Sequence, residues 1–208
     1  WIKDKLFQKQ SLVRELKSLL CKNINWSDRL LFSEHHISHA ASAFFPSPYK
    51  RAAVLTLDGV GEWTTSSLAV GNGRSLKVIK EVHFPHSLGL LYSAFTYYLG
   101  FKVNSDEYKV MGLAPYGNPK YLEALRDILC LEDDGGFSLN LKYFRHHNEK
   151  VSYEWSGGEP SVGTLFRAEA IEELIKLPLR CREDPLEQTH KDLAHSVQAM
   201  YEEAFFHL

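Results

Sequence analysis

Three features are scarce in this sequence: cysteine, charge of one sign, and long apolar runs. Only three of the 208 residues are cysteines; they stand far apart (Cys21, Cys130 and Cys181) and show no CxxC spacing. This pattern excludes a disulfide framework and a zinc ribbon, and it predicts reduced thiols in a cytoplasmic protein. The formal net charge is −2, and local basic runs are absent. Both observations argue against a nucleic-acid binder.

A membrane span is also not expected. Residues 83–101 contain no Asp, Glu, Lys or Arg, but the run includes His83, Pro85, His86 and two glycines. Such a composition predicts a buried helix with a polar entry rather than a bilayer-spanning helix. No signal peptide opens the sequence, which begins Trp1-Ile2-Lys3-Asp4 without a methionine and ends within an expected helix. We therefore expect an internal piece of a longer polypeptide.

Apolar periodicity predicts an α/β domain, because strand-like and helix-like segments alternate along the chain. Residues 52–57 form a near-continuous apolar run, as expected for a central strand that is buried on both faces. Asn72-Gly73 predicts the turn of a hairpin. Ser87 is placed to cap a helix, and Gly100 to end it. The expected strands are 29–33, 52–57, 64–70, 76–82 and 137–144, and the expected helices are 5–20, 34–45, 88–99, 119–129, 163–176 and 186–207, with a polar surface segment at 145–162.

The sharpest chemical feature is the segment Glu34-His35-His36-Ile37-Ser38-His39. In a helix, His35 and His39 lie four residues apart on one face, so both imidazoles can reach one metal ion. Two imidazoles rarely bind a metal tightly without help, so a carboxylate from elsewhere would be needed. The alternative is that three clustered histidines cap a helix and satisfy one another on the surface.

The expected strand 52–57 is followed by Asp58-Gly59-Val60-Gly61. Two glycines let a backbone approach a ligand closely, and exposed amides in such a turn suit phosphate oxygens. An Asp at the end of a strand can also hold a metal or a water. An ordinary hairpin turn explains the same four residues.

A third segment, DEYKVMGLAPYG at 106–117, combines charge, aromatic rings and glycine. Lys109 could meet a phosphate or a carbamoyl group, whereas the alternative is a solvated pair with Glu107. Neither a GxSxG elbow nor a GxxxxGK[ST] phosphate loop occurs in the sequence.

Read together, three stretches resemble the NodU/CmcH-type O-carbamoyltransferases. They are HHISHAASAFFPSPYKRAAVLTLDGVGEW, FPHSLGLLYSAFTYYLGF and SDEYKVMGLAPYG. The resemblance is close over residues 29–122 and looser to the end. It implies that residues 1–208 form part of an actin-like, ribonuclease-H-like domain with a mixed sheet and flanking helices. In this interpretation 29–122 is the motif-bearing core, and 123–208 is a mainly helical region that leads toward a second half.

The resemblance also implies a reaction. A YrdC-like domain makes carbamoyl-adenylate from carbamoyl phosphate and ATP, and the actin-like domain passes the carbamoyl group to a hydroxyl of a sugar or antibiotic-like small molecule. A divalent metal, generally iron, is held against the nucleotide phosphates by an HxxxH pair and a distant Asp. No membrane partner is implied.

By position, the resemblance makes His35 and His39 the metal ligands and places Asp58, Gly59, Val60 and Gly61 in the first phosphate loop. Lys109 lies in a matched motif as a further nucleotide contact, and the acceptor hydroxyl needs a base, for which His36 and Asp58 are the local candidates. The third metal ligand, the second half and the YrdC-like domain are expected outside this chain. We therefore expect the 208 residues alone not to catalyse carbamoyl transfer.

Two other functions stay open. One is a relative of the transferase that places threonylcarbamoyl on tRNA, against which the acidic net charge argues. The other is a module that binds metal or nucleotide without turnover.

Overall fold

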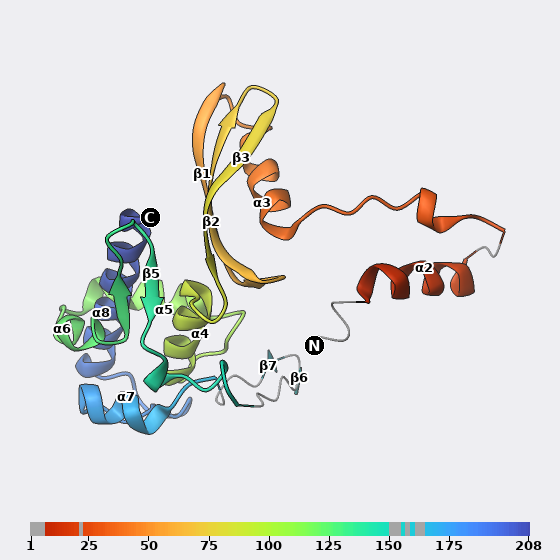
Figure 1. Cartoon of the computed structure of the whole chain (residues 1–208). Coiled ribbons are helices and arrows are strands. Elements are labelled where there is room, and N and C mark those ends of the chain that lie inside the picture. The colour runs from red at the N-terminus through yellow and green to blue at the C-terminus, as the bar shows by residue number, and fades with distance from the viewer. Residues whose placement is uncertain (1–6, 21–22, 150–154, 157–158, 161–164) are drawn as a thin grey trace.

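The computed structural model describes residues 7–20, 23–149, 155–156, 159–160 and 165–208. Three parts can be distinguished in Figure 1. A body of helices lies on one side, an upright three-stranded sheet stands beside it with helix α3 (His35–Phe44) on its other side, and helix α2 (Gln8–Leu19) lies on an arm that reaches away from both. The site described below lies where the sheet, α3 and the helical body meet.

The sheet is an antiparallel meander of β1 (Arg51–Gly61), β2 (Thr64–Asn72) and β3 (Ser75–His83), in the order β1-β2-β3. The predicted hairpin is confirmed, and Gly73 has the positive φ of 58° that its turn needs. The prediction of a central strand ending at Asp58 is wrong. Among the described residues β1 is an edge strand, and it continues to Gly61 through an irregularity that follows Leu57.

Helix α3 packs on the sheet through a thin apolar layer of Ala40, Phe44, Val54 and Ala69. Gly71 makes room for the largest of these side chains, since a Cβ at this position would lie 2.5 Å from the Phe44 ring. Burial of a side chain such as Phe or Val contributes roughly 1.5–3 kcal/mol. Even with the partly buried Leu76 and Val78 packed beside it, this layer is small, and polar contacts also attach α3 to the sheet.

Helix α4 (Leu88–Tyr98) is the centre of the main core, with eight of its eleven residues buried. Its predicted ends are confirmed. The Ser87 hydroxyl accepts a hydrogen bond from the Leu90 amide, and Gly100 takes the left-handed conformation with φ of 75°. The predicted buried helix in 83–101 is thus correct. No helix in the described ranges has the length and apolarity that a membrane crossing requires.

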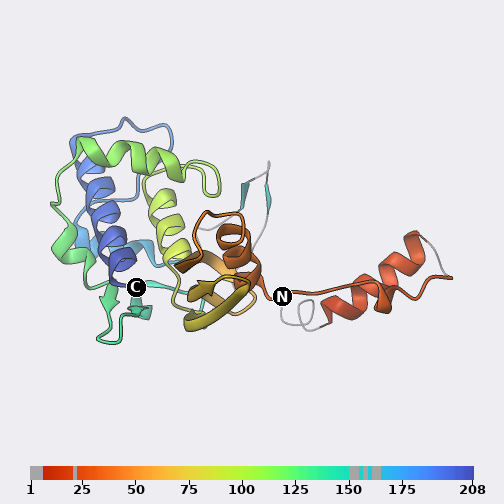
Figure 2. The same ribbon diagram turned by 90° about the horizontal axis from the view of Figure 1, so that it is seen from above.

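Helix α5 (Glu107–Leu113) and the short η2 (Ala114–Tyr116) cross over α4 and α8 (Gln188–His207), as Figure 2 shows. Helix α8 confirms the prediction for 186–207, and it buries Leu193, Val197 and Met200 from the expected stripe. Helix α7 (Ala168–Ile175) is shorter than the predicted 163–176, of which residues 163 and 164 lie outside the described ranges.

The helix predicted for 119–129 is mostly wrong. Only α6 (Leu122–Leu125) forms, because Leu129–Leu131 is paired as β4 with β5 (Phe137–Leu139). Gly135, with φ of 82°, lies in the turn between these strands. The strand predicted for 137–144 therefore ends at Leu139, and the 3-10 turn η3 (Leu141–Tyr143) follows. The polar segment 145–162 is described only in part, with a two-residue pairing of β6 (Trp155–Ser156) and β7 (Glu159–Pro160).

The arm carries another wrong prediction. Helix α2 forms where expected and is followed by η1 (Trp26–Asp28), but residues 29–33 do not form a strand. Leu31 is 99% exposed. A strand needs a neighbour for its backbone hydrogen bonds, and the described part of the chain places none beside this segment.

The chain is thus confirmed as a mixture of helices and sheets. A mixed sheet is not seen, because every strand pairing in the described residues is antiparallel.

Candidate metal centre

Two imidazoles project from the first turns of α3. His35 and His39 occupy positions i and i+4 of this helix, so they lie on the same face of it. Their Nε2 atoms lie 2.9 Å apart. Cation ligands in a filled tetrahedral site with bonds of about 2.0–2.1 Å are roughly 3–3.5 Å apart. The observed separation is slightly shorter than this range, so the two rings would part a little around a shared ion.

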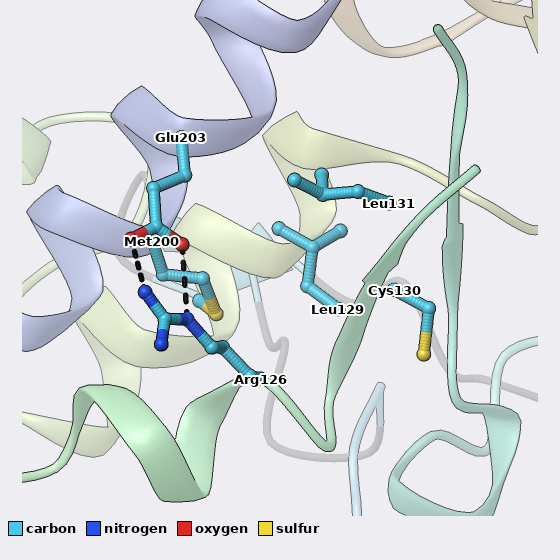
Figure 3. Close-up of a pocket in the computed structure, with 6 residues that line it drawn as sticks. All are labelled: Arg126, Leu129, Cys130, Leu131, Met200 and Glu203. Carbon is cyan, nitrogen blue, oxygen red and sulfur yellow. Dashed lines mark hydrogen bonds and ion pairs between the residues drawn. The ribbon is translucent and has the colours of Figure 1, made fainter. Parts of the chain in front are cut away.

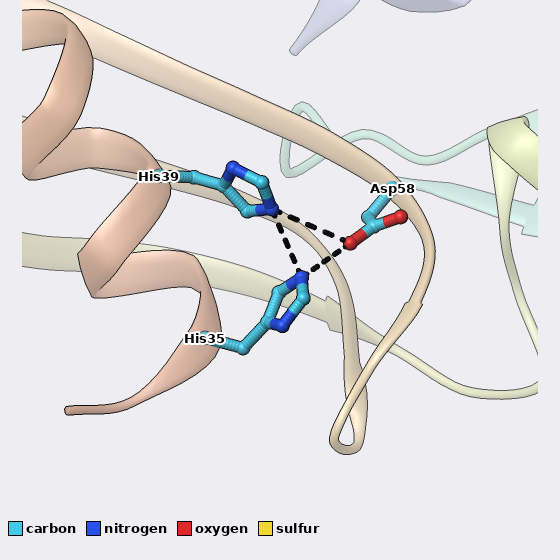
Figure 4. Close-up of side chains that lie close together, drawn as sticks. All are labelled: His35, His39 and Asp58. Atoms are coloured by element: carbon cyan, nitrogen blue, oxygen red, sulfur yellow. Dashed lines mark hydrogen bonds and ion pairs between the residues drawn. The ribbon is translucent and has the colours of Figure 1, made fainter. Parts of the chain in front are cut away.

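A carboxylate from the sheet completes the group. Oδ2 of Asp58, on β1, lies 2.5 Å from Nε2 of His35 and 3.6 Å from Nε2 of His39 (Figure 4). One ligand atom from each residue thus lies within 4.8 Å of the other two. The helical spacing predicted the pair of histidines, and the structure confirms that these rings converge. It also places beside them Asp58, for which the sequence allowed a metal, a phosphate loop or the role of base.

Neighbouring groups keep Asp58 ionised. Burial by itself would raise the pKa of its carboxyl group, but hydrogen bonds from His35 and from the Gly59 amide, together with the two imidazoles, lower that pKa below its usual value. The Gly59 amide donates to Oδ1 over 2.6 Å, which leaves Oδ2 to face the imidazoles. The side chains remain accessible, with exposures of 40% for His35, 54% for His39 and 32% for Asp58.

The residues present fit a divalent cation. His35 can donate one ring hydrogen to Asp58, and Nε2 of His39 lies 2.9 Å from the same His35 nitrogen, so three potential ligand atoms crowd one point. A cation accepts lone pairs from all three atoms at once. Two imidazoles and one carboxylate suit zinc, iron, cobalt or nickel.

The backbone on both sides of Asp58 is held by close approaches. A Cβ at Gly61 would lie 2.2 Å from Cδ2 of His35, so the ring rests on this glycine. On the other side, a Cβ at Gly89 would lie 2.6 Å from the Asp58 carbonyl oxygen. The Ser87 hydroxyl also donates toward the carbonyls of Asp58 and Gly59, at 3.0 and 2.6 Å. The first turn of α4 is therefore docked directly behind the carboxylate.

Residues 58–61 are part of strand β1 and do not form the expected turn. A Cβ at Gly59 would find only Leu90 Cδ2, at an ordinary 3.8 Å, so packing does not require glycine there. Gly61, by contrast, has a packing role that the sequence pattern did not reveal. Val60 packs against the main core.

His36 points away from the cluster. It is 4% exposed, and its ring nitrogens bond to Thr56 Oγ1 at 2.6 Å and to the Thr64 carbonyl at 2.9 Å. Burial lowers the pKa of this imidazole. With both nitrogens engaged, His36 has no free atom with which to meet a substrate hydroxyl.

Lys109 also lies apart from the cluster. Its ammonium group pairs with Asp106 at 2.9 Å, one helical turn away. The surrounding motif 106–117 is docked on α8, where Gln188 donates to the Tyr116 carbonyl and His195 Nδ1 lies 3.0 Å from the Ala114 carbonyl. Directly after the motif, the Asn118 amide donates to Asp192 and the Tyr121 amide to Ser196. Gly117 permits this docking, because a Cβ there would lie 2.0 Å from the Lys191 carbonyl oxygen. Backbone groups of this motif and of the residues directly after it therefore hold α8 in place.

The pocket drawn in Figure 3 lies elsewhere, between α6, β4 and α8, and encloses about 170 Å³. An ion pair of Arg126 with Glu203 lies across it at 2.7 Å. Its lining residues are Arg126, Leu129, Cys130, Leu131, Met200 and Glu203. None of the three candidate ligands lines this pocket.

Residues 1–203 match the family described as Carbamoyltransferase N-terminus. The chain belongs to this carbamoyltransferase family. The resemblance noted from three sequence stretches is therefore correct. In this family member the three stretches place the histidine pair on α3, Asp58 on β1, α4 behind the carboxylate, and the 106–117 motif against α8.

Similar full-length proteins are longer. An uncharacterized protein of Synechocystis is 49% identical over 210 residues, which cover 100% of this chain and 32% of that protein. Nodulation protein NolNO of Sinorhizobium fredii is 36% identical over 86% of this chain and 23% of its own length. Nodulation protein NolO of Bradyrhizobium diazoefficiens is 34% identical over 83% and 27%. The chain thus spans about a third or less of the relatives that it matches.

Proposed function

We propose that this carbamoyltransferase domain binds a divalent cation, most simply Fe²⁺, through His35, His39 and Asp58, and presents it to the phosphate oxygens of carbamoyl-adenylate. The parent polypeptide would transfer the carbamoyl group to a hydroxyl of a small molecule such as a sugar. The convergence of three ligand atoms from α3 and β1 on one accessible point carries this proposal. Family membership supports carbamoyl transfer in general.

The proposed reaction exchanges one acyl bond for another. The acceptor hydroxyl oxygen forms a bond to the carbamoyl carbon, the bond from this carbon to the phosphate oxygen of AMP breaks, the hydroxyl proton passes to a base, and AMP leaves. When bound, a divalent cation would neutralise charge on the phosphate and make AMP a better leaving group.

Within this chain, the three side chains would hold and orient the donor. Asp58 is suited to a ligand role rather than to the role of base, because its lowered pKa makes the carboxylate a weak proton acceptor near neutral pH. His36 is not carried into the mechanism, because its ring nitrogens are occupied inside the protein. The amides of Gly59 and Gly61 and the ammonium of Lys109 remain proposed nucleotide contacts.

We further propose that the meander β1–β2–β3, followed by α4 packed behind it, is the beginning of an actin-like, ribonuclease-H-like unit. The order of three antiparallel strands and then a helix supports this assignment. ATP and carbamoyl phosphate as precursors, a YrdC-like part that joins them, and a cytoplasmic location belong to the same proposal.

Calorimetric titration of the 208-residue chain with Co²⁺ and, without oxygen, Fe²⁺ tests the cation. We expect saturable binding of one ion, and loss of that binding in the double variant His35→Ala/His39→Ala. A matched control is His207→Ala, because this histidine lies at the other end of the chain and bonds to the Glu132 carbonyl. Equal binding by the chain and the double variant would overturn the assignment.

Nucleotide binding tests the next step. We expect the cation-loaded chain to bind ATP more tightly than the cation-free chain, because the ion would contact the phosphates. Cation binding without any effect on nucleotide affinity would contradict a transferase site. The expectation that the 208 residues do not complete the transfer stays a prediction, which radiolabelled carbamoyl phosphate with ATP and a hydroxyl acceptor would check.

A further inference from the structure

A chain of buried hydrogen bonds lies directly beneath the candidate metal centre. His36 is packed between α3 and the sheet, where it contacts Thr56 on β1. Thr56 Oγ1 in turn lies 2.7 Å from the Ser67 hydroxyl on β2. The three side chains are 4%, 8% and 2% exposed, so the chain is shielded from water. We call His36, Thr56 and Ser67 the buried relay.

Chemistry fixes the direction of these bonds. The Thr64 carbonyl can only accept a hydrogen bond, so Nε2 of His36 must carry the hydrogen that it donates. In the neutral ring Nδ1 is then an acceptor, and the Thr56 hydroxyl must donate to it. Because the Thr56 hydrogen is used in this way, the Ser67 hydroxyl donates to Thr56. Every bond therefore depends on the one before it.

The buried relay and the candidate metal centre use neighbouring residues of the same helix and the same strand. His35 and His36 are consecutive on α3, and Thr56 and Asp58 are two apart on β1, where both face α3. The helix is thus joined to the strand twice, once at the surface through His35 and Asp58 and once in the interior through His36 and Thr56. Consecutive helix residues differ by about 100° around the axis. Two such links fix the rotation of α3 about its own axis.

We propose that His36 is a positioning residue which, through Thr56 and Ser67, holds α3 in the rotation that aims His35 and His39 at Asp58 before a cation arrives. The thin apolar layer under α3 gives this helix few other constraints. A preorganised ligand pair binds a cation more tightly, because less freedom is lost on binding. This inference rests on the proposed function in that the ligand of the cluster is a cation.

The substitution Thr56→Val tests the buried relay, because it keeps the shape of the side chain and removes the hydroxyl that donates to His36. We expect the affinity for Co²⁺ alone, measured by calorimetry, to fall by about tenfold, as for other outer partners of metal ligands. The visible spectrum of bound Co²⁺ should change as well, since it reports the arrangement of the ligands. Thr56→Ser retains the hydroxyl and should restore both the affinity and the spectrum.

Thr96→Val is the matched control for general damage. Thr96 is 0% exposed and donates to the Tyr92 carbonyl within α4, away from α3. This variant should lower the melting temperature without changing Co²⁺ affinity or spectrum. The proposal is overturned if Thr56→Val binds Co²⁺ within about twofold of the parent with the same spectrum, or if Thr96→Val weakens binding equally.

A metal-free measurement separates this inference from the proposed function. Long-range ¹⁵N–¹H spectra of the histidine rings should show His36 with its hydrogen on Nε2, and Thr56→Val should shift the ring signals of His35 and His39. If the parent binds no Co²⁺, the cation proposal fails, and these spectra still decide the relay. Unchanged His35 and His39 signals in Thr56→Val would refute it.

Discussion

Two motif-bearing regions of this molecule use their polar groups in opposite ways. Around α3 and β1, polar side chains of His35, His39 and Asp58 point at one another and at solvent, with 32–54% of each exposed. Around the 106–117 motif and α8, polar side chains are buried and bond to the backbone. Asp192 and Ser196 accept hydrogen bonds from backbone amides and are 7% and 0% exposed.

This difference separates chemistry from architecture. Converging polar atoms that are left accessible can bind a ligand, whereas polar atoms that satisfy buried backbone groups stabilise the fold. Both motifs contain candidate ligands as sequence, and the contacts of their polar atoms distinguish them in the structure. Substitutions in the first region should therefore change cation binding with little effect on stability, and substitutions in the second should do the reverse.

Loss of the carboxylate should have the largest effect. Asp58→Asn keeps the size of the side chain but replaces the ionised ligand, and we expect Co²⁺ affinity to fall by more than about 100-fold, beyond the loss typical of outer partners. Calorimetry measures it. Asp134→Asn is the control, because Asp134 is an exposed carboxylate outside the candidate ligand set that pairs with Lys80 and accepts from the Gly136 amide. A parent-like affinity in Asp58→Asn would place the cation elsewhere.

Glycine substitutions next to the carboxylate should separate packing from phosphate contact. Gly61→Ala would put a methyl group 2.2 Å from the His35 ring, so the ring must move and Co²⁺ affinity should fall by roughly 10–100-fold. In Gly59→Ala the methyl group finds space, and the affinity for the cation alone should stay at the parent level. If both variants bind Co²⁺ alike, the ring does not depend on Gly61.

The second region should respond in stability. Asp192→Ala removes a carboxylate that is 7% exposed and accepts the hydrogen of the Asn118 amide, and we expect the free energy of unfolding to fall by about 1–3 kcal/mol. Urea denaturation measures it, and Co²⁺ affinity should be unaffected. Glu202→Ala on the same helix is the control: Glu202 is exposed and accepts a hydrogen bond from Gln198, one turn away in α8, so a change within about 0.5 kcal/mol is expected.

The smallest expected effect is a dependence of stability on pH. Burial lowers the pKa of His36, His86 and His190 below the ordinary value of 6.5. Below about pH 6.5 the unfolded chain therefore binds more protons than the folded chain. Above that pH the three histidines should cost the folded state nothing. As the pH drops toward 5, the free energy of unfolding should fall by at most about 1.4 kcal/mol per pH unit for each histidine.

His190→Gln isolates one contribution to this dependence. His190 occupies the third position of a capping box at the start of α8, where Gln is an ordinary partner, so the cap is kept and the titrating group is lost. Urea denaturation at several pH values should give a flatter profile in this variant. A profile identical to that of the parent would show that His190 is not protonated on unfolding.

Much of this arrangement was predictable from local sequence rules. The i, i+4 spacing of His35 and His39, the Asn-Gly hairpin, the Ser87 cap and the Gly100 end each depend on a few neighbouring residues, and each is confirmed. The predicted helix over 119–129 failed, because cross-strand pairing of β4 with β5 outweighed local preference.

Other features depend on the third dimension. Asp58 was recognised as a candidate ligand type at a strand end, but its distance to the histidines is set by how α3 lies on the sheet. Three further roles come from contacts between residues that are far apart in the sequence. Gly61 contacts His35 across 26 residues, Gly89 contacts Asp58 across 31, and Thr56 contacts His36 across 20. Spacing rules do not reach across such distances.

The docking of α4 behind Asp58 has a consequence for how the molecule unfolds. Ser87 and Gly89 tie the carboxylate strand to the main core, while His35 and His39 lie on α3, which packs on the sheet through the separate small apolar cluster. An ion held by all three ligands would link α3 to the main core through Asp58. At a free concentration 100 times its dissociation constant, it adds about 2.7 kcal/mol to the stability of the folded state. The melting temperature of the chain should therefore rise with the concentration of the cation.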